Sequence, residues 1–571
     1  TMSNISEITM DKNTTIKEAM IVMTSAGPKK LPTGIVIITG KNNKLLGVVT
    51  DGDIRRALLK GKTLNDPVEN IMITNPVHLK NSENIKNMSA EIISQIELAN
   101  KEGRIRSKKV NQILLINEDG TPQDIISFYD IWKLSNTKTK RVCILGTGYV
   151  GLTLSLVLAD KGFKVIGYDI DKHKIEQLSK GKLTFYERGI DSLLTKHIHN
   201  NFQVTNKLVP DMADIYIISV GTPVNNENKP ELHMVESAAK SLAKVIKKGD
   251  SIILRSTVPV GTCRNTVLPI LEKESGLICG IDFYLAFAPE RTIEGKAIEE
   301  LNSLPQIIGA YNTTSLSNIS DFFRKLSPHI VSTNNLEEAE MAKLINNTFR
   351  DISFAFSNEL ALICAEHNMD VDRVVKSAND GYKRNKIPFA SPGVGGLCLR
   401  KDPYIYSNAS KDTSILALAA RKINDKLPHH VANKIEQFSN KTNKTNPKIF
   451  LLGLAFKGQP ETSDLRDSTS IDIFNILKQK GFKNIYGYDP IANSDELKQL
   501  GINTATPEEG FKDADIVAIL NNNKKYMDLD INSLIKTSNK PLLFLDTWHI
   551  FTKESISQDN VFYSGLSFDQ F

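Results

Sequence analysis

The sequence predicts an α/β protein in which two doubly wound parallel sheets are joined by a long central helix and preceded by a smaller α+β module. Three observations lead to this fold class. Residues 141–171 and 448–490 each follow the order strand, loop, helix, strand. Residues 336–380 carry apolar side chains at helical spacing, and two short strand–turn–strand–helix units precede residue 135. The length leaves room for about three to five domains.

Composition and charge narrow the functional class. Charged residues make up 24% of the chain and the net charge of +6 is spread without long basic runs, so an anionic small substrate fits better than nucleic acid. The sequence has no signal pattern and no long uninterrupted apolar stretch, so we expect no membrane span and a cytoplasmic location. Five scattered cysteines favour free thiols, and without a CxxC pair, a His-rich tract or an HExxH motif no metal site is expected.

The N-terminal segment contains a degenerate repeat. The stretch GIVIITGKNNKLLGVVTDGDIRRALL (34–59) reads as strand, turn, strand and helix, and QILLINEDGTPQDIISFYDIWKL (112–134) repeats that order. Each unit resembles a CBS motif, and the two together resemble a CBS pair, which we assign to residues 1–138.

The resemblance to CBS pairs implies a regulatory module that binds an adenine nucleotide, with Thr50 and Asp53 contacting phosphate and ribose. Ser127 and Asp130 stand at the matching spacing in the second unit, which lacks the glycine and threonine of the first. The alternative is that Thr50 only caps the helix that follows and that the module mediates assembly.

The stretch RVCILGTGYVGLTLSLVLADKGFKVIGYDID carries the strongest single motif. An apolar strand enters Gly146-x-Gly148-x-x-Gly151, a helix follows, and a second strand ends at Asp169, 18 positions after the last glycine. This is the pattern of a dinucleotide-binding Rossmann unit, in which the glycines allow a tight turn, a close approach of pyrophosphate and close helix packing. Asp169 would accept hydrogen bonds from the adenosine ribose, which favours NAD over NADP.

Other coenzyme candidates surround this motif. The stretches 214–224 and 250–261 are apolar strands that end in hydroxyl residues, Thr222 and Thr257, at the edge where a doubly wound sheet binds its ligand, although both could instead cap helices. Lys174 slightly weakens the preference for NAD. The coenzyme-binding candidates are Gly146, Gly148, Tyr149, Val150, Gly151, Asp169, Lys174, Thr222 and Thr257.

The pattern over 336–380 predicts a long helix followed by a second short one. A long helix between two α/β units offers a surface along which two chains could pair as a homodimer. Lys343 and Asn347 are four residues apart and therefore share one helical face. Further along, SPGVGGLCLRKDP (391–403) places Cys398 after a glycine-rich turn, where the thiol is either a buried apolar residue or a nucleophile.

Six motifs occur in one order: GTGYVG, RSTVPVGT, APERTIEGKA, AEMAKLINNTFRDISFAFSNE, PGVGGLCLRKDP and GLAFKGQPETSDLRDS. From about residue 140 onward the chain therefore resembles the UDP-glucose/GDP-mannose dehydrogenase superfamily, whose members oxidise C6 of a nucleotide sugar to the carboxylate with two NAD. The resemblance implies an NAD-binding Rossmann domain (139–335), a central helical dimerisation domain with the cysteine loop (336–440) and a Rossmann-like UDP-sugar-binding domain (441–571). The last domain repeats the strand, loop, helix and strand order but lacks GxGxxG.

The resemblance also gives Cys398 a role. In the family this cysteine adds to the intermediate aldehyde to form a thiohemiacetal, and the thioester that the second oxidation produces is then hydrolysed. Such an addition needs the thiolate, so we expect Arg400, Lys401 and Lys343 to lower the pKa of the thiol.

The remaining catalytic assignments follow from the same resemblance. Lys343 stabilises the developing oxyanion, while Asn347 and Asp402 position and activate water. Glu290 serves thioester hydrolysis, and Thr257 supports the same site. The substrate-binding candidates are Glu290, Arg384, Gly395, Lys457 and Arg466.

Three of the substrate candidates come with reservations. Lys457 and Arg466 suit phosphate or carboxylate recognition, in the family sometimes across a subunit boundary, but the spacing between them is longer here than the family's usual spacing. Arg384 lies in DGYKRNKIPFAS, which either shapes the substrate pocket or is a purely structural loop.

The stretches NNTFRDISFAFSNELALIC and PGVGGLC resemble the bacterial and archaeal branch that acts on UDP-N-acetylhexosamines. We therefore expect a 6-dehydrogenase that converts UDP-N-acetylmannosamine or UDP-N-acetylglucosamine to the uronic acid, for surface polysaccharide precursors. UDP-glucose is the alternative substrate. An alternative of another class is a nucleotide-sensing regulatory protein on an inactive dehydrogenase scaffold, which the joint presence of Cys398, Lys343, Asn347 and Asp402 disfavours.

Overall fold

The computed structural model describes most of the chain. The described residues are 5–26, 34–80, 95–96, 98–99, 101–102, 112–127, 140–183, 185–327, 329–384, 386–410, 412–556 and 558–571. The chain divides into two compact units, one of Thr1–Thr139 with Asp321–Ile330 and one of Lys140–Ser320 with Val331–Phe571.

The N-terminal unit contains two small sheets, with the strand orders β1-β2-β3-β4 and β5-β6-β7. The strands are β1 (Thr9–Asp11), β2 (Ile35–Thr39), β3 (Leu45–Thr50), β4 (Ile73–Thr74), β5 (His78–Lys80), β6 (Gln112–Ile116) and β7 (Pro122–Ser127), and the helices are α1 (Ile16–Ala26) and α2 (Asp51–Leu59). Alternate residues of β2, such as Val36 and Ile38, pack with Ile16 and Met23 of α1 in one apolar core. The order predicted for 34–59 is confirmed, whereas Asp130 lies outside the described residues.

The second unit opens with an eight-stranded sheet of order β10-β9-β8-β11-β12-β13-β14-β15. Its strands are β8 (Arg141–Leu145), β9 (Lys164–Tyr168), β10 (Phe202–Thr205), β11 (Ile215–Ile218), β12 (Ser251–Leu254), β13 (Tyr284–Phe287), β14 (Gln306–Ala310) and β15 (Ile330–Ser332). The strands from β10 to β13 pair in parallel, and β14 pairs with β13 antiparallel. In chain order the six parallel strands run 3-2-1-4-5-6, which is the doubly wound dinucleotide-binding topology.

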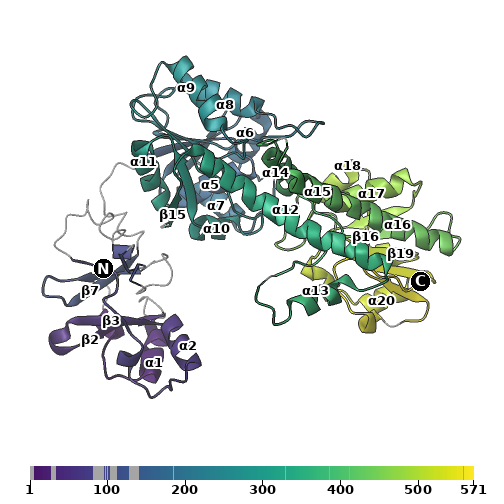
Figure 1. The fold of residues 1–571 in the computed structure, drawn as a ribbon, viewed down its shortest axis with the longest axis horizontal. Coiled ribbons are helices and arrows are strands. Elements are labelled where there is room, and N and C mark those ends of the chain that lie inside the picture. The colour runs from purple at the N-terminus through teal and green to yellow at the C-terminus, as the bar shows by residue number, and fades with distance from the viewer. Residues whose placement is uncertain are drawn as a thin grey trace. The chain divides into compact units, whose positions relative to one another are not determined.

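Helices cover both faces of this sheet (Figure 1). They are α5 (Tyr149–Asp160), α6 (Lys172–Ser179), α7 (Ile190–His197), α8 (His233–Ala243), a π-helix (Cys263–Val267), α9 (Leu268–Ser275), α10 (Ala297–Ser303) and α11 (Thr313–Arg324). The β-branched and aliphatic strands are buried on both faces, as expected for a parallel sheet.

The central helix α12 (Leu336–Glu366) has 31 residues and therefore spans about 46 Å at 1.5 Å per residue. Its N-terminus is capped by Asn335, whose side chain accepts the Glu338 N–H. Figure 1 shows it running from the first sheet to the second, and it packs against α14 and α15. The neighbouring helices are α13 (Val371–Asn379), α14 (Leu397–Ser407), α15 (Ile415–Asn424) and α16 (Lys426–Lys441).

The C-terminal sheet repeats the topology of the first, with the order β18-β17-β16-β19-β20-β21 and all neighbours parallel. Its strands are β16 (Ile449–Leu452), β17 (Ile485–Tyr488), β18 (Asn503–Thr504), β19 (Ile516–Ile519), β20 (Leu542–Asp546) and β21 (Val561–Ser564), and its helices are α17 (Thr469–Gln479), α18 (Ser494–Gln499), α19 (Pro507–Phe511) and α20 (Ile531–Lys536). The predicted pair of doubly wound sheets joined by a long helix is confirmed.

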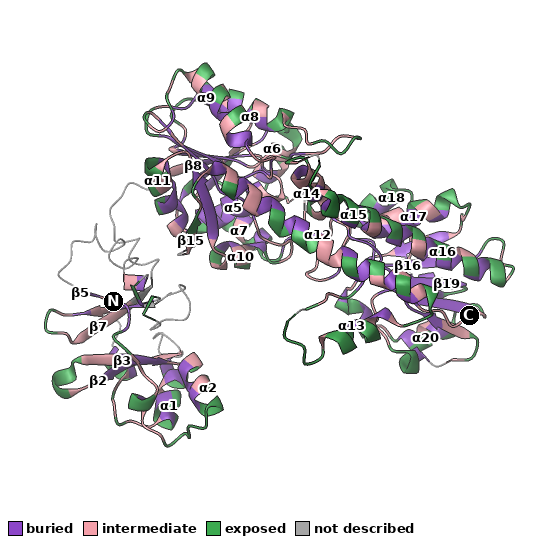
Figure 2. Ribbon diagram, in the orientation of Figure 1, coloured by how far each residue is buried: buried purple, intermediate pink, exposed green. Residues whose placement is uncertain are grey.

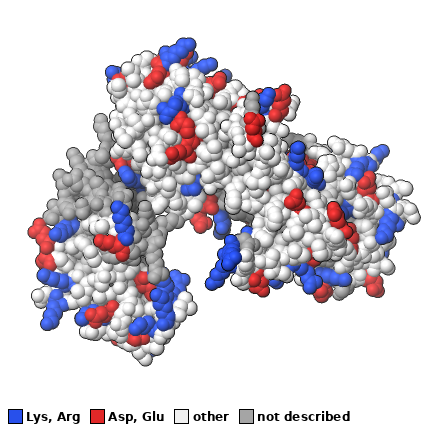
Figure 3. Space-filling view, viewed as in Figure 1, with Lys and Arg blue, Asp and Glu red and all other residues white. Residues whose placement is uncertain are grey.

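The surface agrees with the composition. Figure 2 shows buried strands at the centre of both large sheets and exposed outer faces on their helices. On the face drawn in Figure 3, Lys and Arg alternate with Asp and Glu and form no continuous basic stripe. Among the helices in the described part of the chain, none has the length and apolar character needed to cross a membrane.

Candidate active site

The glycine turn between β8 and α5 has the shape that a dinucleotide needs. Gly146 has φ +97°, and a Cβ there would lie 2.6 Å from the Ser219 carbonyl oxygen. A Cβ on Gly151 would lie 1.8 Å from the Gly146 carbonyl oxygen, so helix and turn pack too closely for any side chain. Gly148, by contrast, caps the N-terminus of α5 and has open space beside it. A pyrophosphate can therefore reach the backbone N–H groups at this helix end.

Asp169 follows β9 beside this turn. Burial alone would raise its pKa, but the Thr147 N–H (2.8 Å), the Asp171 N–H (3.1 Å), the Thr147 hydroxyl (2.9 Å) and the nearby Lys174 hold the pKa of Asp169 below its ordinary value. The carboxylate is thus an ionised acceptor, as ribose hydroxyls require. Lys174 donates to Asp169 at 3.1 Å, so its charge is already paired with that carboxylate.

Two further coenzyme candidates meet at the same edge of the sheet. The Thr222 hydroxyl donates to the Thr257 carbonyl oxygen at 2.5 Å, which joins the loops that follow β11 and β12. Val150 is the second residue of α5, directly after Tyr149. The Tyr149 hydroxyl donates to Glu187 at 2.5 Å, so it is held by a protein carboxylate beside the turn.

Cys398 is the second residue of α14, and its N-cap Gly396 has φ +88°. Part of the side chain reaches solvent, but protein atoms crowd the sulfur. Desolvation raises the pKa of the Cys398 thiol and Asp402 adds to the rise, whereas Lys343 and Lys401 oppose it without reversing it. Lys343 and Lys401 thus act on this pKa in the expected direction, but desolvation and Asp402 outweigh them.

Arg400, the third expected cation, is engaged by carboxylates outside α14. It pairs with Asp472 of α17, and its guanidinium lies 4.0 Å from Asp467. The sequence could not show that this charge is already neutralised.

Asp402 lies at the centre of a buried polar group. Its side chain is 0% exposed, and it accepts the Asn347 amide at 2.6 Å and the Lys401 ammonium at 2.8 Å. Asn347 and Lys343 are 9% and 7% exposed on one face of α12, where that helix packs on α14. Lys343 lowers the pKa of both Cys398 and Glu290, so its ammonium lies within electrostatic range of both. The structure thus brings together Cys398, Lys343, Asn347 and Asp402.

Glu290 is held by a residue that the sequence analysis missed. Arg255, 1% exposed at the end of β12, donates to Glu290 Oε2 from Nη2 (2.7 Å) and Nε (3.2 Å). Glu290 Oε1 accepts the N–H groups of Arg291 and Thr292, each at 2.8 Å. Burial would raise the pKa of Glu290, but Arg255 and these bonds leave it lowered, so the carboxylate stays ionised. The signal in the sequence was an arginine at a strand end within RSTVPVGT.

Glu294, four positions along the same loop, was noted in the sequence beside Glu290 but was given no role. Burial raises the pKa of Glu294 to about 7, helped by Asp464 and opposed by Lys457 and Arg466. The Thr462 hydroxyl donates to its carboxylate at 3.2 Å, and the Lys457 ammonium donates to its carbonyl oxygen at 2.7 Å. Burial in turn lowers the pKa of Lys457 to about 8. Both groups can therefore exchange protons near neutrality.

Of the remaining substrate candidates, two lie near the cysteine loop and one does not. A Cβ on Gly395 would lie 2.7 Å from the Asp467 carbonyl oxygen, so the cysteine loop packs tightly on the segment after Arg466. Arg466 donates to Asp464 at 2.6 Å and lies close enough to Cys398 for the two charges to interact. Arg384 is exposed over the Tyr382 ring, 5.9 Å from its centroid, and is not part of the Cys398 group in the single chain.

In the N-terminal unit, Thr50 and Asp53 form a reciprocal capping box at the start of α2. Arg56 donates to Asp53 at 2.5 Å. The capping role of Thr50 is therefore present, and nucleotide binding by Thr50 and Asp53 stays a prediction.

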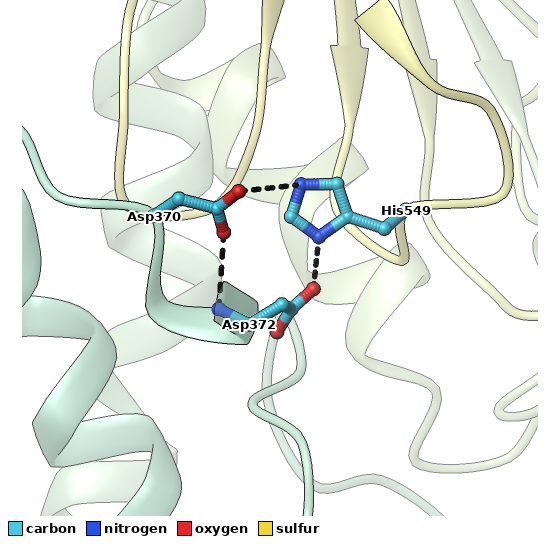
Figure 4. Close-up of side chains that lie close together, drawn as sticks. All are labelled: Asp370, Asp372 and His549. Atoms are coloured by element: carbon cyan, nitrogen blue, oxygen red, sulfur yellow. Dashed lines mark hydrogen bonds and ion pairs between the residues drawn. The ribbon is translucent and has the colours of Figure 1, made fainter. Parts of the chain in front are cut away.

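One group of metal-type donors occurs in the described part of the chain: Asp370, Asp372 and His549. Figure 4 shows the imidazole between the two carboxylates, with one ring nitrogen facing each. Burial would lower the pKa of His549, but Asp372 and Asp370 leave it raised, so a protonated imidazole bridging two carboxylates accounts for the geometry without an ion.

Comparison with known proteins places the chain in one family. The models of the UDP-glucose/GDP-mannose dehydrogenase family match residues 140–327 (NAD binding domain), 337–426 (central domain) and 450–553 (UDP binding domain). A CBS domain matches residues 3–60.

Curated relatives and solved structures agree with these matches. A UDP-N-acetyl-D-mannosamine dehydrogenase from Campylobacter jejuni is 33% identical over 405 residues, covering 69% of this chain and 98% of that protein. An NDP-N-acetyl-D-galactosaminuronic acid dehydrogenase from Ralstonia solanacearum is 30% identical, covering 69% and 93%. The structure of UDP-D-ManNAc dehydrogenase from Pyrococcus horikoshii superposes with a TM-score of 0.68 at 30% identity, covering 75% of this chain and 99% of that one. The chain therefore belongs to the UDP-glucose/GDP-mannose dehydrogenase family, as an NAD-dependent nucleotide-sugar dehydrogenase with an N-terminal CBS domain.

Proposed function

We propose that the protein oxidises C6 of a UDP-N-acetylhexosamine to the carboxylate with two NAD per sugar, as a step toward surface polysaccharide precursors. UDP-N-acetylmannosamine is the first candidate and UDP-N-acetylglucosamine the second, because three relatives at 30% identity or more carry names of N-acetylated sugars. The observation that carries the proposal is the convergence of Cys398 with Lys343 and the Asn347–Asp402 pair between the two nucleotide-binding sheets. UDP-glucose is the alternative substrate.

NAD would lie across the Gly146 turn, with its ribose at Asp169 and its far end toward Thr222 and Thr257. Each of the two oxidations would transfer one hydride from C6 to a separate NAD. The aldehyde left by the first oxidation would escape unless the protein held it. Cys398 holds it: the sulfur bonds to C6, and the thiol proton ends on the former carbonyl oxygen, giving a thiohemiacetal.

The raised pKa of Cys398 means that the thiol loses its proton during addition rather than beforehand. Lys343 offsets the charge that grows on the carbonyl oxygen. Asp402, held by Asn347 and Lys401, is the nearby carboxylate that can take a proton. This division of roles explains why an acidic residue beside the nucleophile is useful although it raises the pKa of the thiol.

Hydrolysis of the thioester requires a base that is deprotonated at neutral pH. Water adds to the acyl carbon, the C–S bond breaks, and the Cys398 thiol and the sugar carboxylate are released. Glu290, ionised by Arg255, supplies fixed negative charge and orients water, and Glu294 with its pKa of about 7 accepts the proton.

We further propose that two chains pair along the central helix. Four apolar side chains of α12 are exposed on one stripe, at spacings of four and seven residues: Ile345, Phe349, Phe356 and Ile363. Ile415 and Leu416 are also exposed, at the start of α15, which packs on α12. A second copy would bury these residues, and light scattering measures the resulting mass.

The CBS module is proposed to bind an adenine nucleotide through Thr50 and Asp53 and to shift turnover or assembly. Arg56 beside Asp53 adds a cation suited to phosphate. Calorimetry with AMP, ADP and ATP tests binding, and kinetics of a chain without residues 1–138 test regulation. Heat with ATP but no NADH from any sugar would instead favour the regulatory scaffold.

The test of the main proposal is the number of NADH formed per sugar with UDP-N-acetylmannosamine, UDP-N-acetylglucosamine and UDP-glucose in parallel. Two NADH from one N-acetylated sugar, and a Cys398→Ser variant that stalls at the aldehyde, support it. No NADH from any of the three, or a Cys398→Ser variant as fast as the wild type, contradicts it.

A further inference from the structure

Glu187 is a buried carboxylate that joins two loops far apart in the sequence. It is 1% exposed. Its Oε2 accepts the Tyr149 hydroxyl at 2.5 Å and the Gly295 N–H at 2.6 Å, and its Oε1 accepts the Ala297 N–H at 3.0 Å. Tyr149 opens α5 in the coenzyme turn, whereas Gly295 and Ala297 follow directly on Glu294. Glu187 therefore bridges the coenzyme turn and the turn that carries Glu294.

The C-terminal domain holds the same turn from the other side. Gly295 has φ +89°, and a Cβ there would lie 2.7 Å from both the Glu461 carbonyl oxygen and the Pro460 Cβ. The Lys457 ammonium also donates to the Glu294 carbonyl oxygen. The segment between Lys457 and Arg466 thus packs closely against the Glu294 turn. This segment is longer than in the family's usual pattern. Glu187 is the contact that links the Glu294 turn to the coenzyme turn within the NAD-binding domain.

A carboxylate is a costly side chain to bury at this position. The free-energy cost of desolvating an ion is offset only when hydrogen-bond donors surround it, and three donors bind the carboxylate here. An apolar side chain would fill the space without this cost, so the carboxylate is explained by the groups that it holds. Burial and the Glu187 contact raise the pKa of Tyr149 far above its usual value, so the hydroxyl remains a donor at any working pH.

We propose that Glu187 is a positioning residue which, through Tyr149, couples occupation of the coenzyme turn to the placement of the Glu294 carboxylate at the sugar site. Coenzyme bound against the N-terminus of α5 fixes Tyr149, and Glu187 passes that constraint to Gly295 and Ala297. The inference rests on the proposed function, because Glu294 matters only if C6 is oxidised at Cys398. Because Glu187 is 1% exposed, it acts through these contacts and not directly on substrate or coenzyme.

Hydrogen exchange tests the coupling without turnover. The amides of Gly295 and Ala297 donate to Glu187, so their exchange rates report on this contact directly. In the wild type, saturating NAD is expected to slow their exchange about tenfold. In Tyr149→Phe, which removes one hydroxyl, that NAD-dependent slowing should vanish while calorimetry still detects NAD binding. Equal protection in the variant and the wild type would overturn the proposal.

Kinetics test the consequence. Glu187→Gln keeps the size of the side chain but removes the charge, and we expect kcat to fall about 10- to 100-fold, with KM for the UDP-sugar changed less than about threefold. The rise of kcat with pH that we assign to Glu294 should also move, because a loosened turn is better solvated. A purely structural role would lower Tm and leave kcat and the pH profile unchanged, which contradicts the proposal.

Two matched controls lie in the C-terminal domain. Tyr563→Phe removes a hydroxyl that donates to the Phe551 carbonyl oxygen, and Asp546→Asn removes a fully buried carboxylate that accepts the Trp548 and Phe551 N–H groups. Equal losses of kcat in these controls would overturn the role of Glu187. If no UDP-sugar yields NADH while Tyr149→Phe still abolishes the NAD-dependent protection, the proposed function fails and the coupling stands.

Discussion

Replacing Asp402 by Asn should make the Cys398 thiol more reactive and the enzyme slower. Asp402 raises the pKa of Cys398, because a carboxylate disfavours a nearby thiolate. The two residues are four apart on α14, where Cβ atoms lie about 5–6 Å from each other. At about 6 Å and a dielectric constant of about 20, two unit charges interact by about 3 kcal/mol. Lys401, 2.8 Å from Asp402, and solvent screening leave about 1 kcal/mol, or about fivefold more thiolate at neutral pH.

Turnover should change in the opposite direction. The Asn347 amide and the Lys401 ammonium lose the charge on their shared acceptor, and loss of a proton acceptor costs about 10²- to 10⁴-fold in rate. Alkylation of Cys398 by iodoacetamide from about pH 6 to about pH 9 measures the thiolate, and NADH formation measures turnover. Asp546→Asn is the control for loss of a buried carboxylate far from the thiol. Alkylation of Asp402→Asn at or below the wild-type rate would refute the reasoning.

Three further outcomes are expected. Because burial raises the pKa of Glu294 to about 7, the base forms as pH rises through that value, so kcat should rise there in the wild type and the rise should be absent in Glu294→Gln. Phe349→Asp places a charge on the exposed stripe of α12 and should shift the mass in light scattering toward one chain, whereas Lys536→Asp at an exposed position of α20 in the C-terminal domain should not. The raised pKa of His549 means that its carboxylate pairing stabilises the fold fully below about pH 6.5 and is lost as pH rises through the raised pKa. The Tm difference between wild type and His549→Asn should therefore be larger at about pH 6 than at about pH 9, and an equal difference at both would contradict this sign.

The fold could be predicted because its signals are local. The glycine turn, the alternation of strand and helix and the helical spacing over 336–366 each depend on neighbouring residues, and the structure has all three. Lys343 and Asn347 were placed on one face by their spacing alone, and both are buried there. Asp402 could be placed beside them only by resemblance, since 55 residues separate it from Asn347.

What the sequence could not give depends on burial and on long-range contacts. Glu187 meets Gly295 across 108 residues, and no spacing rule links such positions. The sign of the shift in the pKa of Cys398 depends on how desolvation and Asp402 compare with two lysines, which requires packing. The exposure of the Arg384 side chain in the single chain also depends on packing, so it could not be predicted from DGYKRNKIPFAS.

The two glutamates of the 290–294 loop bear on which residue hydrolyses the thioester. The family resemblance assigns this step to Glu290, yet Arg255 and two backbone N–H groups keep Glu290 ionised and make it a weak base. Glu294, four residues away, has a pKa of about 7 because it is buried beside Asp464. Titratable pairs whose environments push their pKa values apart commonly divide acid–base work in this way. The environment therefore favours Glu294 as the group that exchanges the proton, with Glu290 as the fixed charge that orients the water. If Glu294 exchanges the proton, the position of its turn matters for the rate, and the Glu187 carboxylate holds that turn in place.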